Sequence, residues 1–128
     1  MEGELQILPI PPATVSRCCV DSDFAIELLG DISTTIRFSG PFLLRPPNRD
    51  EIRLDPANRE SLGSALVLVL DGLLQALVSE EGALTLRFGS GTVLTAAPHP
   101  GYEAWGVSVS NGYGAAAMPT RGWDSWGE

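Results

Sequence analysis

Apolar and polar residues alternate along most of this chain, which predicts β-strands. The stretch FAIELLG (residues 24–30) places phenylalanine, isoleucine and leucine at every second position, and ALTLRF (83–88) does the same with leucine, leucine and phenylalanine. Successive side chains of a strand point to opposite faces, so this period of two indicates strands with one buried face. We expect further strands at 14–20, 33–47, 73–79, 92–97, 105–110 and 115–119. The pair Gly40-Pro41 is expected to divide the second of these into two short strands or to insert a bulge.

A different spacing in LDPANRESLGSALVLVL (54–70) predicts one helix over about residues 56–70. Asp55 suits the N-cap position and Pro56 the first helical position, where its missing N–H costs nothing. The Asp71-Gly72 pair supplies a stop. The run LVLVL alone fits a strand equally well, and the cap favours the helix. The residues expected on its buried face follow the spacing of three and four: Leu62, Ala65, Leu66, Val69 and Leu70.

The segments before and after this helix share one rhythm. TVSRCCVDSDFAIELLGD (14–31) and LLQALVSEEGALTLRFGS (73–90) each read as a strand, an acidic turn, an alternating strand and a glycine-containing turn, with an offset of about 58 to 60 residues. The expected fold class is therefore α+β: a small, mostly antiparallel β-sheet built from two related β-meander halves with one connecting helix.

The length of 128 residues and the 44% hydrophobic content fit one domain with a single core. We expect residues 1–13 to form an extended N-terminal segment. Residues 14–110 are expected to form a single two-repeat β-rich domain, followed by a C-terminal strand or tail over 111–128.

The formal net charge is −8, from 16 acidic residues and eight arginines without any lysine. A negative chain repels phosphate backbones, which argues against nucleic acid as a partner, and it attracts a basic protein.

Compartment and membrane contact are predicted from three features. The first fifteen residues lack the basic and apolar regions of a signal peptide. The longest apolar run is interrupted by Asp71, Gly72 and Gln75, so no membrane span is expected. Cys18 and Cys19 are adjacent, which argues against a disulfide framework and favours two free thiols in a reducing compartment. We expect a cytoplasmic protein.

Groups able to carry catalysis are scarce in this sequence. His99 is the single histidine and stands between two prolines in an extended loop. The GSGT stretch (89–92) lacks the lysine of a phosphate-binding loop. The acidic turns lack the oxygen spacing of a calcium loop, and one histidine with two adjacent cysteines does not suit zinc. No catalytic residue, metal or cofactor is therefore expected.

Aromatic residues supply the candidate partner-binding positions. In the stretch APHPGYEAW (97–105), Tyr102 and the final tryptophan either anchor the loop on the sheet or present a contact for a partner, with Glu103 between them. In the tail RGWDSWGE, Trp123 and Trp126 either fold back over one end of the sheet or bind another surface. The candidate partner-binding residues are thus Tyr102, Glu103, Trp123 and Trp126.

The stretch ALTLRFGSGTVLTAAPHPGYEAW (83–105) resembles a family of short bacterial proteins, common in actinobacteria, known as domain-of-unknown-function family 6188. The resemblance extends over about residues 14–110, through VDSDFAIELLGD and GPFLLR. It implies that PHPGYEAW closes the second meander, and it implies no enzymatic activity. Ser90 departs from the usual acidic turn, and the tail after Gly112 is unfamiliar. The matching motif residues are Leu84, Leu86, Phe88, Gly91, Thr92, Leu94, Pro98, Pro100, Tyr102, Glu103, Ala104 and Trp105.

The expected function is that of a non-catalytic protein-interaction domain. Small proteins of this general type look like immunity or antitoxin partners of toxins, which agrees with an acidic domain that binds a basic partner. Self-association as a homodimer, through a strand edge or the tryptophan tail, is a second hypothesis. A third is a small-ligand site or a hydrolase-like enzyme with a cleft around His99, Tyr102 and Glu103.

Overall fold

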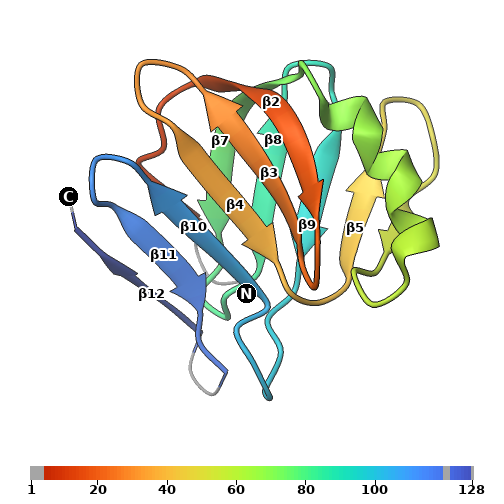
Figure 1. Ribbon diagram of the computed structural model, residues 1–128. Coiled ribbons are helices and arrows are strands. Elements are labelled where there is room, and N and C mark those ends of the chain that lie inside the picture. The colour runs from red at the N-terminus through yellow and green to blue at the C-terminus, as the bar shows by residue number, and fades with distance from the viewer. Residues whose placement is uncertain (1–4, 120–121, 128) are drawn as a thin grey trace.

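The computed structural model describes residues 5–119 and 122–127. This described part forms twelve strands and one short helix (Figure 1). The elements are, in chain order, β1 (Gln6–Ile7), β2 (Ala13–Val20), β3 (Phe24–Leu29), β4 (Thr34–Phe38), β5 (Phe42–Arg45), β6 (Ile52–Leu54), η1 (Arg59–Leu68), β7 (Gly72–Val78), β8 (Leu84–Phe88), β9 (Val93–Ala96), β10 (Trp105–Val109), β11 (Gly114–Ala117) and β12 (Trp123–Trp126).

All strand pairs of the sheet are antiparallel, and two strands are exchanged between its halves. The order is β12-β11-β10-β4-β3-β2-β7-β8-β9-β5-β6, with β1 paired to β7. The meander β2-β3-β4 therefore lies beside the meander β7-β8-β9. The strand that follows each meander crosses to the other one: β5 pairs with β9, and β10 pairs with β4. Each half of the sheet is completed by a strand from the opposite half of the chain.

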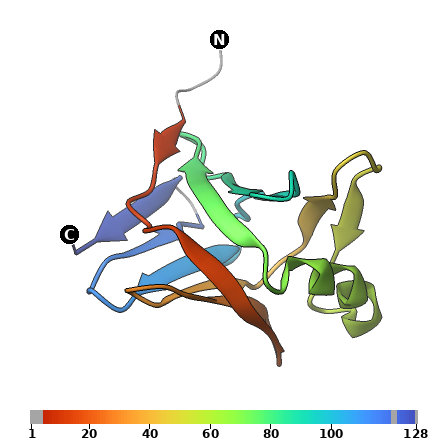
Figure 2. The same ribbon diagram turned by 90° about the horizontal axis from the view of Figure 1, so that it is seen from above.

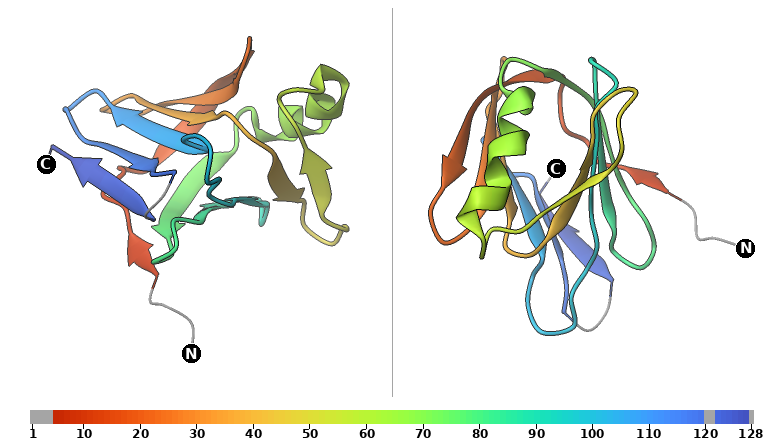
Figure 3. Two further views of the ribbon diagram at one scale, coloured as in Figure 1. Left: turned by 90° about the horizontal axis from the view of Figure 1, so that it is seen from below. Right: turned by 90° about the vertical axis from the view of Figure 1, so that its right-hand side faces the viewer.

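The sheet bends at the β2–β7 seam, so that its two arms form opposing walls (Figure 2). The helix η1 lies across the open side between these walls, as the right panel of Figure 3 shows. Apolar side chains fill the space between the walls. Phe38 of β4 and Phe42 of β5 have ring centroids 4.9 Å apart, and Phe24 of β3 lies 5.3 Å from Phe42. The core thus joins strands of both walls.

The predicted alternation is confirmed in β3 and β8. The phenylalanine, isoleucine and leucine of β3 and the leucines and phenylalanine of β8 are buried, and the polar residues between them face outward. The predicted break at Gly40-Pro41 is also confirmed, since these residues separate β4 from β5. Both β2 and β7 carry a bulge near their first residues, between Val15 and Arg17 and between Leu73 and Gln75.

The helix differs from its prediction in type and in buried face. It is a 3-10 helix over residues 59–68 and not an α-helix over 56–70. Its buried residues are Leu62, Ala65 and Leu68, spaced by three, because a 3-10 helix turns once in three residues. Leu66 and Leu70, expected on the buried face, are exposed, and so is Val69. A 3-10 helix of ten residues spans about 20 Å and an α-helix about 15 Å, so the 3-10 form reaches further along the open side.

The predicted N-cap was also wrong. Asn58 occupies the position before η1 and makes no side-chain cap bond. Asp55 forms an earlier turn instead, in which its Oδ1 accepts a hydrogen bond of 2.9 Å from the N–H of Ala57. The backbone N–H of Asp55 donates in turn to Ser61 Oγ at 2.9 Å. The Asp-Pro signal therefore marks the turn that leads into the helix.

The described residues of the C-terminal segment continue the sheet. β11 pairs with β10, and β12 pairs with β11 as an edge strand. The strand over Trp123–Trp126 was not predicted, because glycine, aspartate and serine seldom build a strand. The molecule is thus a mostly antiparallel β-sheet with one short helix, and the relation between its two halves stays a prediction.

Candidate functional site

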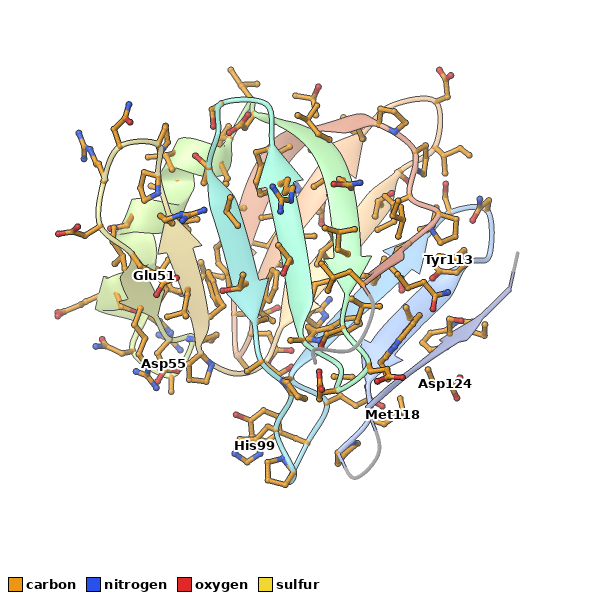
Figure 4. All side chains as sticks on the ribbon, turned by 180° about the vertical axis from the view of Figure 1, so that it is seen from behind. Glu51, Asp55, His99, Tyr113, Met118 and Asp124 are labelled. Atoms are coloured by element: carbon orange, nitrogen blue, oxygen red, sulfur yellow. The ribbon has the colours of Figure 1, made fainter. Side chains whose placement is uncertain are left out.

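The loop that joins β9 to β10 carries His99 at its tip, away from the walls of the sheet (Figure 4). His99 is exposed, and its Nδ1 accepts a hydrogen bond of 2.9 Å from the backbone N–H of Gly101. The imidazole stacks on the ring of Tyr102 with centroids 4.0 Å apart and an angle of 12° between the planes. These contacts hold the turn together.

Two aromatic residues fix the end of this loop. Tyr102 is half-buried and lies over Gly40, where an added Cβ would come within 2.6 Å of the phenolic oxygen. Trp105 is buried, and its indole Nε1–H donates to the carbonyl of Gly82 at 2.8 Å. The anchoring role expected for Trp105 is confirmed by this burial.

The three residues of the predicted ligand cleft do not share one cleft. His99 borders an open depression that Met118 and Pro119 also line. Glu103 lines a separate groove on the outer face of β4, β10 and β11. No hydroxyl or carboxylate among the described residues hydrogen-bonds to the imidazole. The geometry therefore assembles no nucleophile and base at this loop.

The groove that contains Glu103 has a volume of about 390 Å³ and a floor of small residues. We call it the outer groove. Gly106 and Ser108 of β10 and Ala116 of β11 form the floor. Arg37 of β4 and Trp126 of β12 stand at its sides, because outward residues of neighbouring strands lie in register. Small side chains in the middle and large ones at the borders leave a shallow channel along the strands.

Trp126 forms one wall of the outer groove. It is 52% exposed and pairs directly with Gly114 across β11 and β12. A Cβ at Gly114 would collide with the indole, so the ring lies against this glycine and is held in place by it. Trp123, three residues earlier, is half-buried and packs against the core. Of the four predicted partner-binding residues, the structure brings Glu103 and Trp126 together at one groove.

The charges around the outer groove are not balanced. Arg37 lies 3.7 Å from the carboxylate of Asp23. Within the described part of the chain, neither Glu103 nor Asp124 has an arginine within 4.0 Å. Asp124 lies on β12, at the edge of the sheet (Figure 4). The groove is therefore lined by an exposed indole, by Glu103 without an ion-pair partner among the described residues, and by Arg37, whose guanidinium is paired with Asp23.

The two cysteines point to opposite sides of β2, as adjacent strand residues do. The Cys18 thiol lies 3.9 Å from the carbonyl of Ala65 in η1, and Cys19 lies 3.5 Å from Glu27 Oε2. Burial raises the pKa of both thiols. The hydrogen bond from Arg17, at 2.7 Å, lowers the pKa of the Glu27 carboxyl. Both cysteines are free, as expected.

Two further features are absent from the described residues. Residues 5–119 and 122–127 contain no group of three or more histidine, cysteine or acidic side chains placed to hold a metal ion. Over the same residues, no helix is long and apolar enough to cross a membrane.

The small-residue floor is the part of the groove that the sequence analysis missed. The alternation in WGVSV (105–109) assigns Gly106 and Ser108 to the outer face, so the signal for β10 was present. No sequence pattern indicated the register that places Trp126 opposite Gly114, because β12 itself was not predicted.

Fold and groove together define a small antiparallel β-sheet domain with an open groove on its outer face. The chain belongs to the family of unknown function DUF6188, whose model matches residues 6–127. This match confirms the family named by the resemblance, and the actinobacterial origin and the family motif stay predictions. No curated protein and no solved structure matches the chain.

Proposed function

We propose that this protein is a non-catalytic protein-interaction domain that binds a basic partner through the outer groove. The observation that carries the proposal is the half-exposed indole of Trp126, which lies against Gly114 in the groove that Glu103 also lines, with Asp124 two residues earlier on β12. Exposed, immobilised tryptophans are favoured anchors at protein interfaces because they lose little conformational entropy on binding.

The chemistry of the groove favours a cationic side chain. An arginine or lysine placed over the indole face gains a cation–π contact, and a nearby carboxylate accepts its N–H groups. The net charge of −8 adds long-range attraction, which accelerates association and weakens in salt. Arg37 contributes less repulsion because Asp23 lies beside it. The small residues of the floor let a partner backbone approach the sheet closely.

Binding of arginine-rich and lysine-rich peptides, followed by tryptophan fluorescence and calorimetry, tests this proposal. We expect Trp126→Ala to weaken binding about tenfold or more, since anchor residues carry most of the free energy. Glu103→Gln and Asp124→Asn should weaken binding less and flatten its salt dependence. Gly114→Ala should also weaken binding, because the added methyl displaces the indole.

Ser125→Ala is the matched control, since Ser125 lies on the same strand and is exposed. It should bind as the unchanged protein does. Tyr102 and Trp123 remain predicted contacts and belong in the same panel. Equal affinities of Trp126→Ala and the unchanged protein, or equal affinities for basic and acidic peptides, would contradict the proposal.

An immunity- or antitoxin-like role, in which the groove covers a basic toxin, is one form of this function. It includes the cytoplasmic location expected above, and the two free thiols support that location. Rescue of a host cell from the toxin by the unchanged chain, and loss of rescue with Trp126→Ala, tests this form directly.

We also propose that the meanders β2-β3-β4 and β7-β8-β9 are related halves. Their places in the sheet order mirror each other about the β2–β7 seam, and each begins with a bulge at a corresponding position. The exchanged strands β5 and β10 also occupy corresponding places.

A further inference from the structure

The end of η1 and the start of β7 expose an unusual number of large apolar side chains. Leu70 is 78% exposed, Leu74 69% and Leu66 61%. Val67 and Leu29 are also exposed. We call these five residues the leucine surface. Contiguous exposed apolar surface on a folded domain marks an interaction site more often than chance exposure does.

Backbone pairing places three of these residues, Leu29, Leu70 and Leu74, at the β2–β7 seam, and Leu66 and Val67 lie at the end of η1. Leu29 pairs with Thr14, which pairs with Gly72 on the other side. Leu70 and Leu74 stand two residues before and after Gly72, and the N–H of Leu70 donates to the carbonyl of Val15 at 2.7 Å. A side chain added at Gly72 would meet nothing within 4 Å. Gly72 thus has open space beside it, between the exposed leucines that precede and follow it.

The backbone of Leu70 supplies an independent argument. Its φ is 72°, in the left-handed region that glycine and asparagine adopt readily and leucine does not. The side chain gains little inside the molecule, because it is mostly exposed. A strained backbone that presents an apolar side chain to solvent is expected where that side chain has a use outside the fold.

Charge and area indicate which partner covers this surface. Residues 61–79 contain one ionisable side chain, Asp71, which is partly buried. Asp71 accepts hydrogen bonds from the N–H of Gly72 at 2.9 Å and from Ser90 Oγ at 2.5 Å. Two copies that each carry −8 repel one another least across an uncharged surface. Summed over its five residues, the exposed area of the leucine surface is roughly 600 Å² per copy. This area is close to the roughly 800 Å² per partner of a standard interface.

The rim of the surface is also self-complementary. Arg17 and Glu27 form an ion pair of 2.7 Å at one border, on the same two strands as Thr14 and Leu29. A two-fold axis places the same patch of the two copies face to face. Because the rim carries a positive and a negative side chain, each charge can face the opposite charge of the other copy.

We propose that the leucine surface is a two-fold homodimer interface, in which Leu70 is the central contact and a second copy of this chain is the partner. This interface is separate from the outer groove, so both surfaces can be used at once. A dimer interface at the leucine surface accounts together for the exposed apolar residues, the open space beside Gly72 and the strained backbone of Leu70.

Sedimentation and light scattering of the full chain from about 1 to 500 µM test the proposal, since dimers of this area form at roughly micromolar concentrations. Leu70→Asn removes the exposed side chain and relieves the strained backbone at the same time. We expect it to raise the dimer Kd at least about tenfold. Measured at a concentration well below the dimer Kd, its melting temperature should rise by a few degrees, since asparagine tolerates this φ.

Two further variants sharpen the result. Gly72→Gln should fold normally, because its side chain enters open space, and should also raise the Kd. Val20→Ser removes another exposed apolar side chain, in the β2–β3 hairpin away from the seam, and should leave the Kd unchanged. A monomer at every concentration overturns the proposal. So does an unchanged dimer in Leu70→Asn, which would place the interface elsewhere, or a fall in the melting temperature of that variant.

Discussion

Cys18 and Cys19 are neighbours in the chain, but their thiols lie in different environments. The Cys18 thiol lies against η1, and Cys19 lies beside Glu27 on the outer face of β2. Burial raises the pKa of Cys19 most, followed by the hydrogen bond and the negative charge of Glu27, whereas Arg17 lowers it. Because a thiolate is the reactive form, the neighbours of Cys19 set how fast it is alkylated.

Substituting these neighbours should change the reactivity of Cys19 in opposite directions. We expect Glu27→Gln to lower the pKa of Cys19 and to accelerate its alkylation by iodoacetamide at pH 8 by roughly two- to tenfold. Arg17→Gln is the matched variant and should slow the reaction. Peptide mapping by mass spectrometry reads Cys18 and Cys19 separately, and Cys18 should change little. Acceleration of both thiols in both variants would show that the hairpin loosens and would contradict this account.

Which face a residue occupies was predictable where the alternation was regular. The opposite orientations of Cys18 and Cys19 follow directly from their being neighbours on a strand. The site of Trp126 was not predictable in this way. Its position over Gly114 depends on the register between β11 and β12, which local sequence does not encode.

At the scale of elements, the three-residue spacing of η1 predicts which of its leucines stabilise the fold. Leu68 is buried and Leu66 is exposed, although an α-helix would have placed Leu66 with Leu62. We expect Leu68→Ala to lower the free energy of unfolding by about 2 to 4 kcal/mol, because it leaves a cavity in the core. Leu66→Ala should change it by less than about 0.5 kcal/mol.

Urea unfolding at a concentration well below the dimer Kd measures both values without a contribution from the dimer. The two variants carry the same substitution two residues apart, so each controls for the other. A larger loss in Leu66→Ala than in Leu68→Ala would mean that the helix buries the face expected from the sequence.

The strands that alternate cleanly were predicted, and the elements that depend on distant partners were not. β3 and β8 have buried residues at every second position. β1, β6 and β12 have two to four residues each and exist because a neighbouring strand pairs with them. The 3-10 form of η1 likewise depends on the span that it must cover between the walls, which sequence spacing alone does not give.

At the scale of the whole molecule, the exchange of β5 and β10 ties the two halves together. β4 lies between β3 and β10, and β9 lies between β8 and β5. A chain cut between residues 58 and 59 therefore leaves each fragment with a meander that lacks both of its neighbouring strands. We expect fragments 1–58 and 59–128 to be unfolded alone, because small sheets with unpaired edges are marginally stable.

Mixing the fragments should restore the near-ultraviolet circular dichroism of the uncut chain and the amide protection of β4 and β9. The uncut chain, unfolded by urea in parallel, should lose both signals in one transition. Protected amides in β4 of fragment 1–58 alone would contradict the dependence on exchange.

The sequence predicted the two meanders and the helical connection between them, but not the exchange. Local patterns identify which residues form strands, and each meander is a local structure. The exchange depends on the pairing of β4 with β10. The paired residues Phe38 and Trp105 are about 67 residues apart in the sequence. The outer groove depends on the same pairing, since its floor is β10 and one of its sides is β4.

During protein synthesis this exchange delays the completion of the sheet. At about 5 to 20 residues per second, β10 leaves the ribosome several seconds after β4. During that interval the backbone donors and acceptors along one edge of β4 have no partner, which leaves the nascent chain open to pairing with other chains. Fast translation between the codons for β4 and β10, or a chaperone that covers this edge, shortens the exposure. Pauses introduced into that stretch of the message should lower the yield of folded protein, although the amino-acid sequence would be unchanged.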